Sequence, residues 1–413
     1  MQAMGFERIL GGVCAPEGFL ASGVSCGIKE EGGLDLALVY SEKPAAATGV
    51  FTTNSMKSPA VVLSRERLLG GAARAVVVNS GNANSMTGVR GVDDAAAMAV
   101  AVEDALEIPA GQALVASTGR IGEYLPIKRV VSGIRAAVED LNPGGNTDAT
   151  KAIMTTDTYP KELAAKMEIG GKVVRVGAMA KGSGMIHPNL ATMISVITTD
   201  LDIGVDTMRD WLGKAVEWSF NRISVDGDMS TCDTVFMMAN GAVFPGGYKM
   251  TEEEAGLFFK TLCWLTGNLA VALVKDGEGA TKLLRVVVNG AGDDTEAVLV
   301  ARAIGNSSLV KCAFHGGLPA WGRIAAAVGS AGVPVSAEKL SVAIGESEVF
   351  SGGEMVEFDP GELGLVVNRD EVEITVDLGQ GSGSAYFMTC DLSPEYVEFN
   401  AGDKSLWRDP VER

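Results

Sequence analysis

Histidines, paired cysteines and clustered metal ligands are scarce in this sequence of 413 residues. The histidines are His187 and His315, and the six cysteines are scattered without a CxxC pair. This pattern excludes the usual zinc spacings and gives no sign of a disulfide framework. Three carboxylates, Asp226, Asp228 and Asp233, lack the glycine placement and the bidentate glutamate of an EF-hand. We therefore expect no metal site.

Positive charge and long apolar runs are also in short supply. Lysine and arginine number 34 against 52 aspartate and glutamate residues, and no basic stripe is present. Because phosphate binding needs concentrated positive charge, nucleic acid is excluded as a partner. No apolar run approaches the roughly 18 residues of a membrane span, and residues 1–20 lack the apolar core of a signal peptide. We expect a soluble, cytoplasmic chain without a membrane partner.

Alanine, valine and glycine dominate the residues that are present. Hydrophobic residues make up 47% of the chain, aromatic residues only 6%, and there are 52 glycines. Such a composition is typical of tightly packed α/β layers with many close turns. The length suggests two or three domains, and a strand-like run that begins at Leu283 marks a boundary. We predict a layered α/β sandwich of mixed sheets and helices in residues 1–282 and a smaller C-terminal α/β domain in residues 283–413.

Hydrophobic periodicity and capping signals predict the individual elements. Thr251 and Glu254 form a capping box that starts a helix ending near Lys275. Two strand-like runs, 372–378 and 385–389, flank a glycine-rich stretch and predict a hairpin. The helix predicted over 206–220 would bury five residues: Met208, Trp211, Leu212, Ala215 and Trp218. The other predicted elements are strands over 34–40, 45–51, 75–79, 113–117, 172–180 and 283–288 and helices over 92–107, 126–141, 308–314 and 321–328.

The stretch from Lys181 to Asp200 contains a glycine-rich loop that changes abruptly into a β-branched, strand-like run at Thr192. If the bond between Ala191 and Thr192 were cut, Thr192 would carry a free α-amine beside its own hydroxyl. This combination supplies a nucleophile and a base in one residue. An α-amine titrates at about 7.7–8, close to neutral, which suits a general base. From the residues alone, an ordinary strand threonine remains the alternative.

The same stretch resembles the signature of the ornithine acetyltransferase (glutamate N-acetyltransferase) family of arginine biosynthesis. The signature reads Lys-Gly-Ser-Gly-Met, two variable residues, Pro-Asn, one variable residue and Ala-Thr-Met, and the chain matches it from Lys181 to Met193. Family members cut themselves before that threonine and use it to carry an acetyl group. The resemblance extends from about Gly5 to Ser405, and it implies an ornithine acetyltransferase or aminopeptidase-like fold.

The resemblance also implies roles for residues elsewhere in the chain. Ser-Thr-Gly-x-Ile-Gly, here beginning at Ser117, is similar to the family's oxyanion motif and points to Thr118 and Gly119, although a plain turn is the alternative from the residues alone. The loop over 80–85 similarly offers either a turn or support for the active site. The implied substrate-binding residues are Thr158, Lys181, Thr192, Glu278, Asn400 and Ser405. The last two come from a predicted C-terminal strand, so the tail would return to the active site.

The family activity implied for this chain is acetyl transfer from N2-acetyl-L-ornithine to L-glutamate by a ping-pong mechanism through acetyl-Thr192. No cofactor is implied. Acetyl-CoA as an additional donor is left open by the sequence. The implied partners are the small-molecule substrates and the two fragments of the chain itself, 1–191 and 192–413, in a homo-oligomer of the pair such as a heterotetramer.

Two other functions remain open. A self-cleaving aminopeptidase of similar fold would release amino acids instead of passing on an acetyl group. A non-catalytic relative would bind small molecules without turnover. Its support is that the chain departs from the family at Leu318 and Ala320, where Asp and Asn are usual, and in the tail around Ser405.

Overall fold

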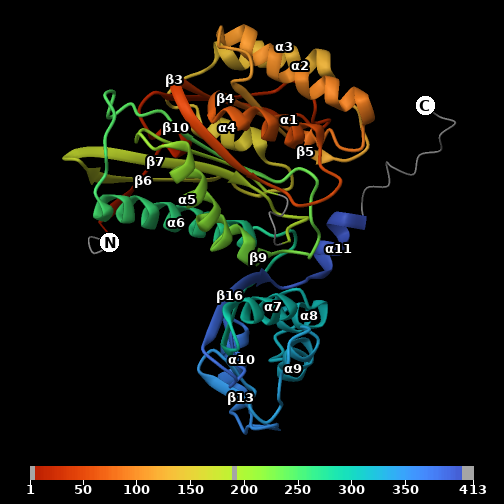
Figure 1. Ribbon diagram of the computed structural model, residues 1–413. Coiled ribbons are helices and arrows are strands. Elements are labelled where there is room, and N and C mark those ends of the chain that lie inside the picture. The colour runs from red at the N-terminus through yellow and green to blue at the C-terminus, as the bar shows by residue number, and fades with distance from the viewer. Residues whose placement is uncertain (1–4, 188–192, 402–413) are drawn as a thin grey trace, which may run out of the picture. The chain divides into compact units, whose positions relative to one another are not determined.

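The computed structural model describes residues 5–187 and 193–401, and the chain forms two compact units (Figure 1). The first unit comprises Met1–Asn221 and Asp228–Leu273. The second comprises Arg222–Gly227 and Val274–Arg413. Predicted residues Ala191, Thr192 and Ser405 lie outside the described part of the chain.

A mixed sheet forms the centre of the first unit. Its parallel pairs are β8 with β10 and β4 with β5, and the other neighbours are antiparallel. The strands lie in the order β1 (Phe6–Ile9), β6 (Lys161–Ile169), β7 (Lys172–Lys181), β8 (Ile194–Thr199), β10 (Thr234–Ala239), β3 (Leu36–Phe51), β4 (Ala72–Asn82) and β5 (Ala113–Arg120), with β2 (Phe19–Val24) paired to β3.

Helices cover both faces of this sheet, and Figure 1 shows α2 and α3 side by side at its outer face. Alternation along β4 explains the layers, because successive side chains point to opposite faces. Ala75 and Val77 belong to a core with α1, α2 and α3, whereas Val76 and Val78 share a core with α4. The helices are α1 (Pro59–Arg67), α2 (Gly88–Leu106), α3 (Ile127–Glu139), α4 (Asn146–Ile153), α5 (Val205–Glu217) and α6 (Glu252–Lys275), with short 3₁₀ helices at Gly12–Cys14, Leu68–Gly70 and Phe220–Arg222.

The second unit is built on a seven-stranded sheet. Val286 and Val288 of β11 share its core with Val300 of α7 and Phe314 of α8. The strand order is β14 (Glu354–Met355), β13 (Ser347–Ser351), β12 (Ser341–Ile344), β15 (Glu371–Asp377), β11 (Leu283–Ala291), β16 (Gly383–Cys390) and β9 (Ile223–Ser224). The helices are α7 (Asp294–Gly305), α8 (Ser308–His315), α9 (Trp321–Gly329), α10 (Pro360–Val367) and α11 (Pro394–Ala401). The predicted class, layered α/β with mixed sheets, is confirmed.

Several local predictions agree with the structure. The capping box at the start of α6 is present, since Glu254 N donates to Thr251 Oγ1 at 3.2 Å and Thr251 N donates to Glu254 Oε2 at 2.8 Å. Met208, Leu212 and Ala215 of α5 are buried as predicted. Trp218 was placed on the same face wrongly, because it is 51% exposed. The helix ends at Glu217, so the helical period no longer applies at Trp218.

The predicted hairpin of 372–378 with 385–389 is wrong. The strands β15 and β16 lie on opposite sides of β11, to which β15 is parallel and β16 antiparallel. The glycine-rich loop between them passes the end of β11, where Leu378 N donates to Asn289 O at 3.0 Å and Gln380 N to Gly290 O at 2.7 Å. Period-two alternation shows that two strands exist but not that a third lies between them.

The predicted C-terminal strand is also wrong, because residues 394–401 form the helix α11. Its start carries two helix signals that the sequence displays, a serine that caps and a proline in the first turn. Ser393 Oγ accepts from Tyr396 N at 3.4 Å, and Pro394 is the first helical residue. The implied position of Asn400 therefore lies on a helix.

The helix α6 bears on the expectation that the chain has no membrane span. By length and composition, α6 suffices to cross a membrane, since it has 24 residues and a mean hydropathy of 1.6 in its most apolar window. Half of that window is buried inside the protein, as is usual for a core helix. The bent pair of α7 and α8 passes the same test when taken together. These features are weak evidence for a membrane, because buried helices share them.

Candidate active site

The end of β5 carries the predicted oxyanion residues. Thr118 is buried within the strand, and Gly119 follows it with a φ of +129°. The parallel register places Gly119 opposite Gly81 of β4. A Cβ at Gly119 would lie 2.3 Å from Gly81 C and 2.4 Å from Asn82 N. These distances are too short for non-bonded atoms, so a side chain at this position would clash with the backbone of β4. Position 119 thus requires glycine both for its conformation and for this close approach.

The side chain of Lys181, at the end of β7, extends to Thr118 at the end of β5. Its side chain is among the largest fully buried ones in the protein. Nζ donates to Thr155 Oγ1 at 2.7 Å and to Thr118 Oγ1 at 3.4 Å. The structure therefore brings together two predicted site residues, Lys181 and Thr118, that are 63 positions apart in the sequence. Burial lowers the pKa of Lys181 below its ordinary value, and the nearby Asp157 carboxylate opposes this shift.

Asp157 is the carboxylate that organises these groups. Its Oδ1 accepts from Lys161 Nζ at 2.7 Å and from Gly182 N at 2.6 Å, and its Oδ2 accepts from Thr155 N at 3.0 Å. Both Asp157 and Lys161 have fully buried side chains. Burial acts to raise the pKa of Asp157, but the ammonium groups of Lys181 and Lys161 and the Gly182 N–H outweigh it and hold that pKa at about 2.

Sequence reasoning did not include Asp157 in the site. The available signal was a single carboxylate within Thr-Thr-Asp-Thr, which is equally typical of a capped turn. The predicted Thr158 is the next residue and is exposed. On the other side, Thr156 shares a hydrogen bond of 2.6 Å with Ser183, in the loop that follows β7.

The start of β8, directly after the predicted cleavage point, is fixed by a second buried carboxyl. Met193 N donates to Asp233 Oδ1 at 3.1 Å, and Thr234 N donates to Met193 O at 3.1 Å. Burial raises the pKa of Asp233 well above its ordinary value, although the Met193 N–H opposes the shift. These bonds hold Met193, the residue that follows Thr192, at the end of the sheet where the parallel strands β8 and β10 begin.

Two further predicted site residues meet within the second unit. Asn400 Nδ2 of α11 donates to Glu278 Oε2 at 2.9 Å. The loop that carries Glu278 approaches the start of α11 closely, because Gly279 has a φ of +69° and a Cβ there would lie 2.5 Å from Ser393 Oγ and 2.7 Å from Tyr396 N. Glycine at 279 therefore permits the contact between Glu278 and Asn400.

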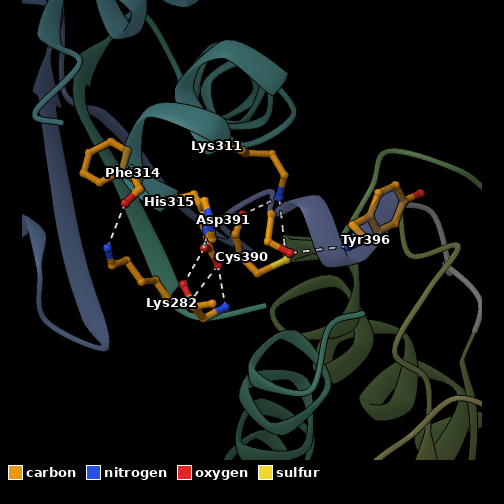
Figure 2. A network of polar contacts seen from close by, with 9 residues as sticks. Lys282, Lys311, Phe314, His315, Cys390, Asp391 and Tyr396 are labelled. Carbon is orange, nitrogen blue, oxygen red and sulfur yellow. Dashed lines mark hydrogen bonds and ion pairs between the residues drawn. The ribbon is translucent and has the colours of Figure 1, made fainter. Parts of the chain in front are cut away.

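A network around Asp391 supports this arrangement (Figure 2). The Asp391 carboxylate accepts from Thr281 N at 2.7 Å, from Thr281 Oγ1 at 2.6 Å, from Lys282 N at 2.9 Å and from His315 Nδ1 at 2.8 Å. Burial acts to raise the pKa of Asp391, but the Thr281 and other hydrogen bonds hold it below its ordinary value. Asp391 thereby ties the loop after Glu278 to the strand that leads into α11.

Lys311 reinforces the same strand from α8. Its Nζ donates to Thr389 Oγ1 at 2.8 Å. It also donates to Cys390 O, and Figure 2 shows Lys311 beside Cys390. Lys282 Nζ in turn donates to Phe314 O at 2.8 Å. Neither Lys311 nor Asp391 was predicted, because their partners come from distant parts of the chain.

The chain matches known proteins over almost its entire length. The model of the ArgJ family matches residues 20–405. This chain belongs to the ArgJ family. It is 43% identical to the arginine biosynthesis bifunctional protein ArgJ of Synechococcus sp., over 97% of this chain and 99% of that protein. It is 45% identical to the ArgJ protein of Symbiobacterium thermophilum, over 95% of this chain and 98% of that protein.

A solved structure of ornithine acetyltransferase from Mycobacterium tuberculosis, complexed with ornithine, is 43% identical in sequence. It aligns with 44% of this chain and 98% of its own, with a TM-score of 0.42. The match to the ArgJ family model and the similar ArgJ proteins confirm the resemblance seen in the signature at the level of the family. The roles of the individual site residues in this ArgJ-family chain remain predictions.

Two of the predicted departures from the family pattern, Leu318 and Ala320, lie between α8 and α9. Leu318 is 54% exposed, and Ala320 has a left-handed conformation with a φ of +47°. Asparagine, which the family resemblance implies at position 320, adopts this conformation more readily than alanine. The departure at Ala320 is therefore a local cost in stability, and it does not touch the contact between Glu278 and Asn400.

Proposed function

We propose that this chain is a self-processing N-terminal-threonine acyltransferase that moves the acetyl group of N2-acetyl-L-ornithine to L-glutamate in arginine biosynthesis. Membership of the ArgJ family over nearly the whole chain supports this function. The observation that carries it is the contact of Lys181, the first residue of the signature, with the Thr118 hydroxyl beside Gly119. These groups lie at the ends of β5 and β7, and they are hydrogen-bond donors of the kind that an acyl-transfer site needs to stabilise an oxyanion.

The first step is cleavage of the bond between Ala191 and Thr192. The Thr192 hydroxyl attacks the Ala191 carbonyl, the peptide bond to the Thr192 nitrogen breaks, and water hydrolyses the resulting ester. This releases the Thr192 α-amine. The fragments are then residues 1–191 and 192–413.

The second stage is acetyl transfer. The Thr192 hydroxyl attacks the acetyl carbonyl of N2-acetyl-ornithine while the α-amine takes its proton. Thr118 Oγ1–H and Gly119 N–H stabilise the oxyanion. The bond from the acetyl carbon to the ornithine nitrogen breaks, ornithine leaves with the proton, and the glutamate amine then attacks acetyl-Thr192 to give N-acetyl-glutamate.

Substrate binding is assigned to five further residues. Lys181 binds the α-carboxylate of the substrate. Glu278 binds the substrate amine, and Asn400 is the hydrogen-bond partner of the Glu278 carboxylate. Thr158 and Ser405 complete the set as predictions from the family pattern. The similar proteins are named bifunctional. We therefore extend the proposal to acetyl-CoA as a second acetyl donor for glutamate.

An acceptor-dependence assay tests the proposal. Labelled N2-acetyl-ornithine should yield labelled N-acetyl-glutamate only when glutamate is present, and the Thr192→Ala chain should yield none. Release of free acetate or of amino acids from peptides at the same rate without glutamate would favour the aminopeptidase alternative. Binding of ornithine derivatives without turnover would favour the non-catalytic alternative.

A further inference from the structure

The contact between Lys181 and Thr118 fixes the direction of a hydrogen bond. A protonated lysine has three N–H donors and no acceptor. Thr118 Oγ1 and Thr155 Oγ1 must therefore accept the bonds from Nζ at 3.4 Å and 2.7 Å. A threonine hydroxyl that accepts from an ammonium group keeps its own proton for donation to another atom. At Thr118, that proton is the one an oxyanion would need.

We propose that Lys181 orients the Thr118 hydroxyl as the oxyanion donor, and that Asp157, Thr155 and Lys161 are positioning residues that set the charge and place of the Lys181 ammonium. The proposal rests on the proposed acyl-transfer function and adds a second role for Lys181 beside substrate binding. Within residues 5–187 and 193–401, two of its three N–H groups serve Thr155 and Thr118, and we assign the third to the substrate.

The place of Lys181 is determined by its neighbours. Thr155 accepts from Nζ, and the backbone N–H of the same residue donates to Asp157 Oδ2 at 3.0 Å. Asp157 also accepts from Gly182 N at 2.6 Å, directly after Lys181 in the chain. One buried carboxylate thus fixes both the residue that holds Nζ and the backbone that carries Lys181.

The charge of Lys181 depends on groups from four segments. Asp157, in the turn before β6, and Asp233, before β10, favour the ammonium form. Cys232, beside Asp233, acts in the same direction to a smaller extent. Lys161 of β6 disfavours the ammonium form, and Lys29, between β2 and β3, interacts with Lys181 in the same sense. A change at Asp157 and a change at Lys161 must therefore move the titration of Lys181 in opposite directions.

These opposite signs define the experiment, which is the pH dependence of kcat for acetyl transfer. Activity needs protonated Lys181, so it falls as the pH rises through the Lys181 pKa. Asp157→Asn removes a favourable charge and should move this alkaline limb to lower pH by about one unit or more. Lys161→Met removes an unfavourable charge and should move the limb to higher pH. Thr155→Val is the third variant. It removes the hydroxyl that accepts from Lys181 Nζ and should move the limb in the same direction as Asp157→Asn.

Matched controls lie on the same strand. Glu168→Gln and Lys166→Met make the same chemical changes at exposed or half-exposed positions of β6 and should leave the limb where it is in the parent chain. Reduced kcat with an unmoved alkaline limb in Asp157→Asn, Lys161→Met and Thr155→Val would overturn the proposal, because a merely structural role changes the level of activity and not its pH dependence.

A double-mutant cycle tests the route through Thr118. Thr118→Ala should lower kcat by about 10²–10³-fold, as for the loss of one oxyanion donor. When Thr118→Ala is already present, adding Lys181→Met should lower kcat by less than a further threefold. The rise in KM that Lys181→Met causes through lost substrate binding should persist in the double variant. Losses in kcat that multiply would contradict the proposal. Intact mass of each variant reports cleavage, and a parent chain that neither cleaves nor transfers acetyl would instead refute the proposed function itself.

Discussion

Asn400 Nδ2 lies 2.9 Å from Glu278 Oε2, so two residues assigned to substrate binding from distant parts of the sequence form one hydrogen-bonded pair. The amide donates to one oxygen of the Glu278 carboxylate, and in our proposal that carboxylate also binds a cationic group. An amino group of ornithine or glutamate is such a group.

The first prediction concerns this pair. Glu278→Gln keeps the shape and removes the charge, so the KM for N2-acetyl-ornithine should rise by about 10–100-fold, the value of a charge-assisted hydrogen bond. Asn400→Ala keeps the charge and should raise KM by less than tenfold. Initial rates over a range of donor concentrations measure both effects. A Glu278→Gln enzyme with an unchanged KM would contradict the assignment of Glu278 to the substrate amine.

Gly119→Ala should abolish measurable transfer and destabilise the chain. The new Cβ would meet the backbone of Gly81 and Asn82 at 2.3 Å and 2.4 Å, and the strand would have to separate from β4. Loss of the oxyanion donor alone costs about 10²–10³-fold in kcat. Gly122→Ala is the control, because φ there is +86° but no described atom lies within 4 Å of the new Cβ. We expect Gly122→Ala to cost about 1–2 kcal/mol in stability and to retain activity.

Ala320 offers a stabilising substitution. Its left-handed conformation costs an L-residue with a Cβ about 1 kcal/mol, and asparagine tolerates the conformation better. Ala320→Asn should raise the free energy of unfolding by about 0.5–1 kcal/mol, and Ala320→Val should lower it by a similar or larger amount. Urea unfolding of the three chains measures this series. Equal stability of the asparagine and valine variants would show that φ at 320 is not strained.

Asp391 should contribute to stability through its four hydrogen bonds. Asp391→Asn replaces two acceptor oxygens by one and should lower the free energy of unfolding by about 1.5–3 kcal/mol at pH 7. The pKa of Asp391 is lowered on folding, so its contribution is present above the unfolded value of about 3.9 and is lost as the pH falls through the folded pKa. The difference between parent and variant should therefore shrink below pH 4. A difference that is the same at pH 7 and pH 3 would exclude this carboxylate as its source.

The sequence predicted those parts of the fold whose signals are local. The capping box of Thr251 and Glu254 fixes the start of α6 within one turn, and the period of Met208, Leu212 and Ala215 identifies the buried face of α5. Ser393 and Pro394 carry an equally local helix signal, whereas the family pattern predicts a strand at this place, and the structure has the helix α11.

Other features depend on contacts that no local pattern encodes. The insertion of β11 between β15 and β16 brings together residues about 100 positions apart, so the alternation of either strand cannot reveal it. The same holds for Asp157, whose importance comes from Lys161, Gly182 and the nearby Lys181. The family resemblance supplied Thr118, Lys181, Glu278 and Asn400, and the structure adds which of them meet.

The most direct test of the central claim is the intact mass of freshly expressed protein under denaturing conditions, with N-terminal sequencing of each species. We predict two fragments, one of which begins Thr192-Met193-Ile194, and a Thr192→Ala chain that stays whole and inactive. A fully active parent preparation that consists only of the uncut chain of 42.8 kDa would contradict the account, because Thr192 would then never gain the amine that serves as its base.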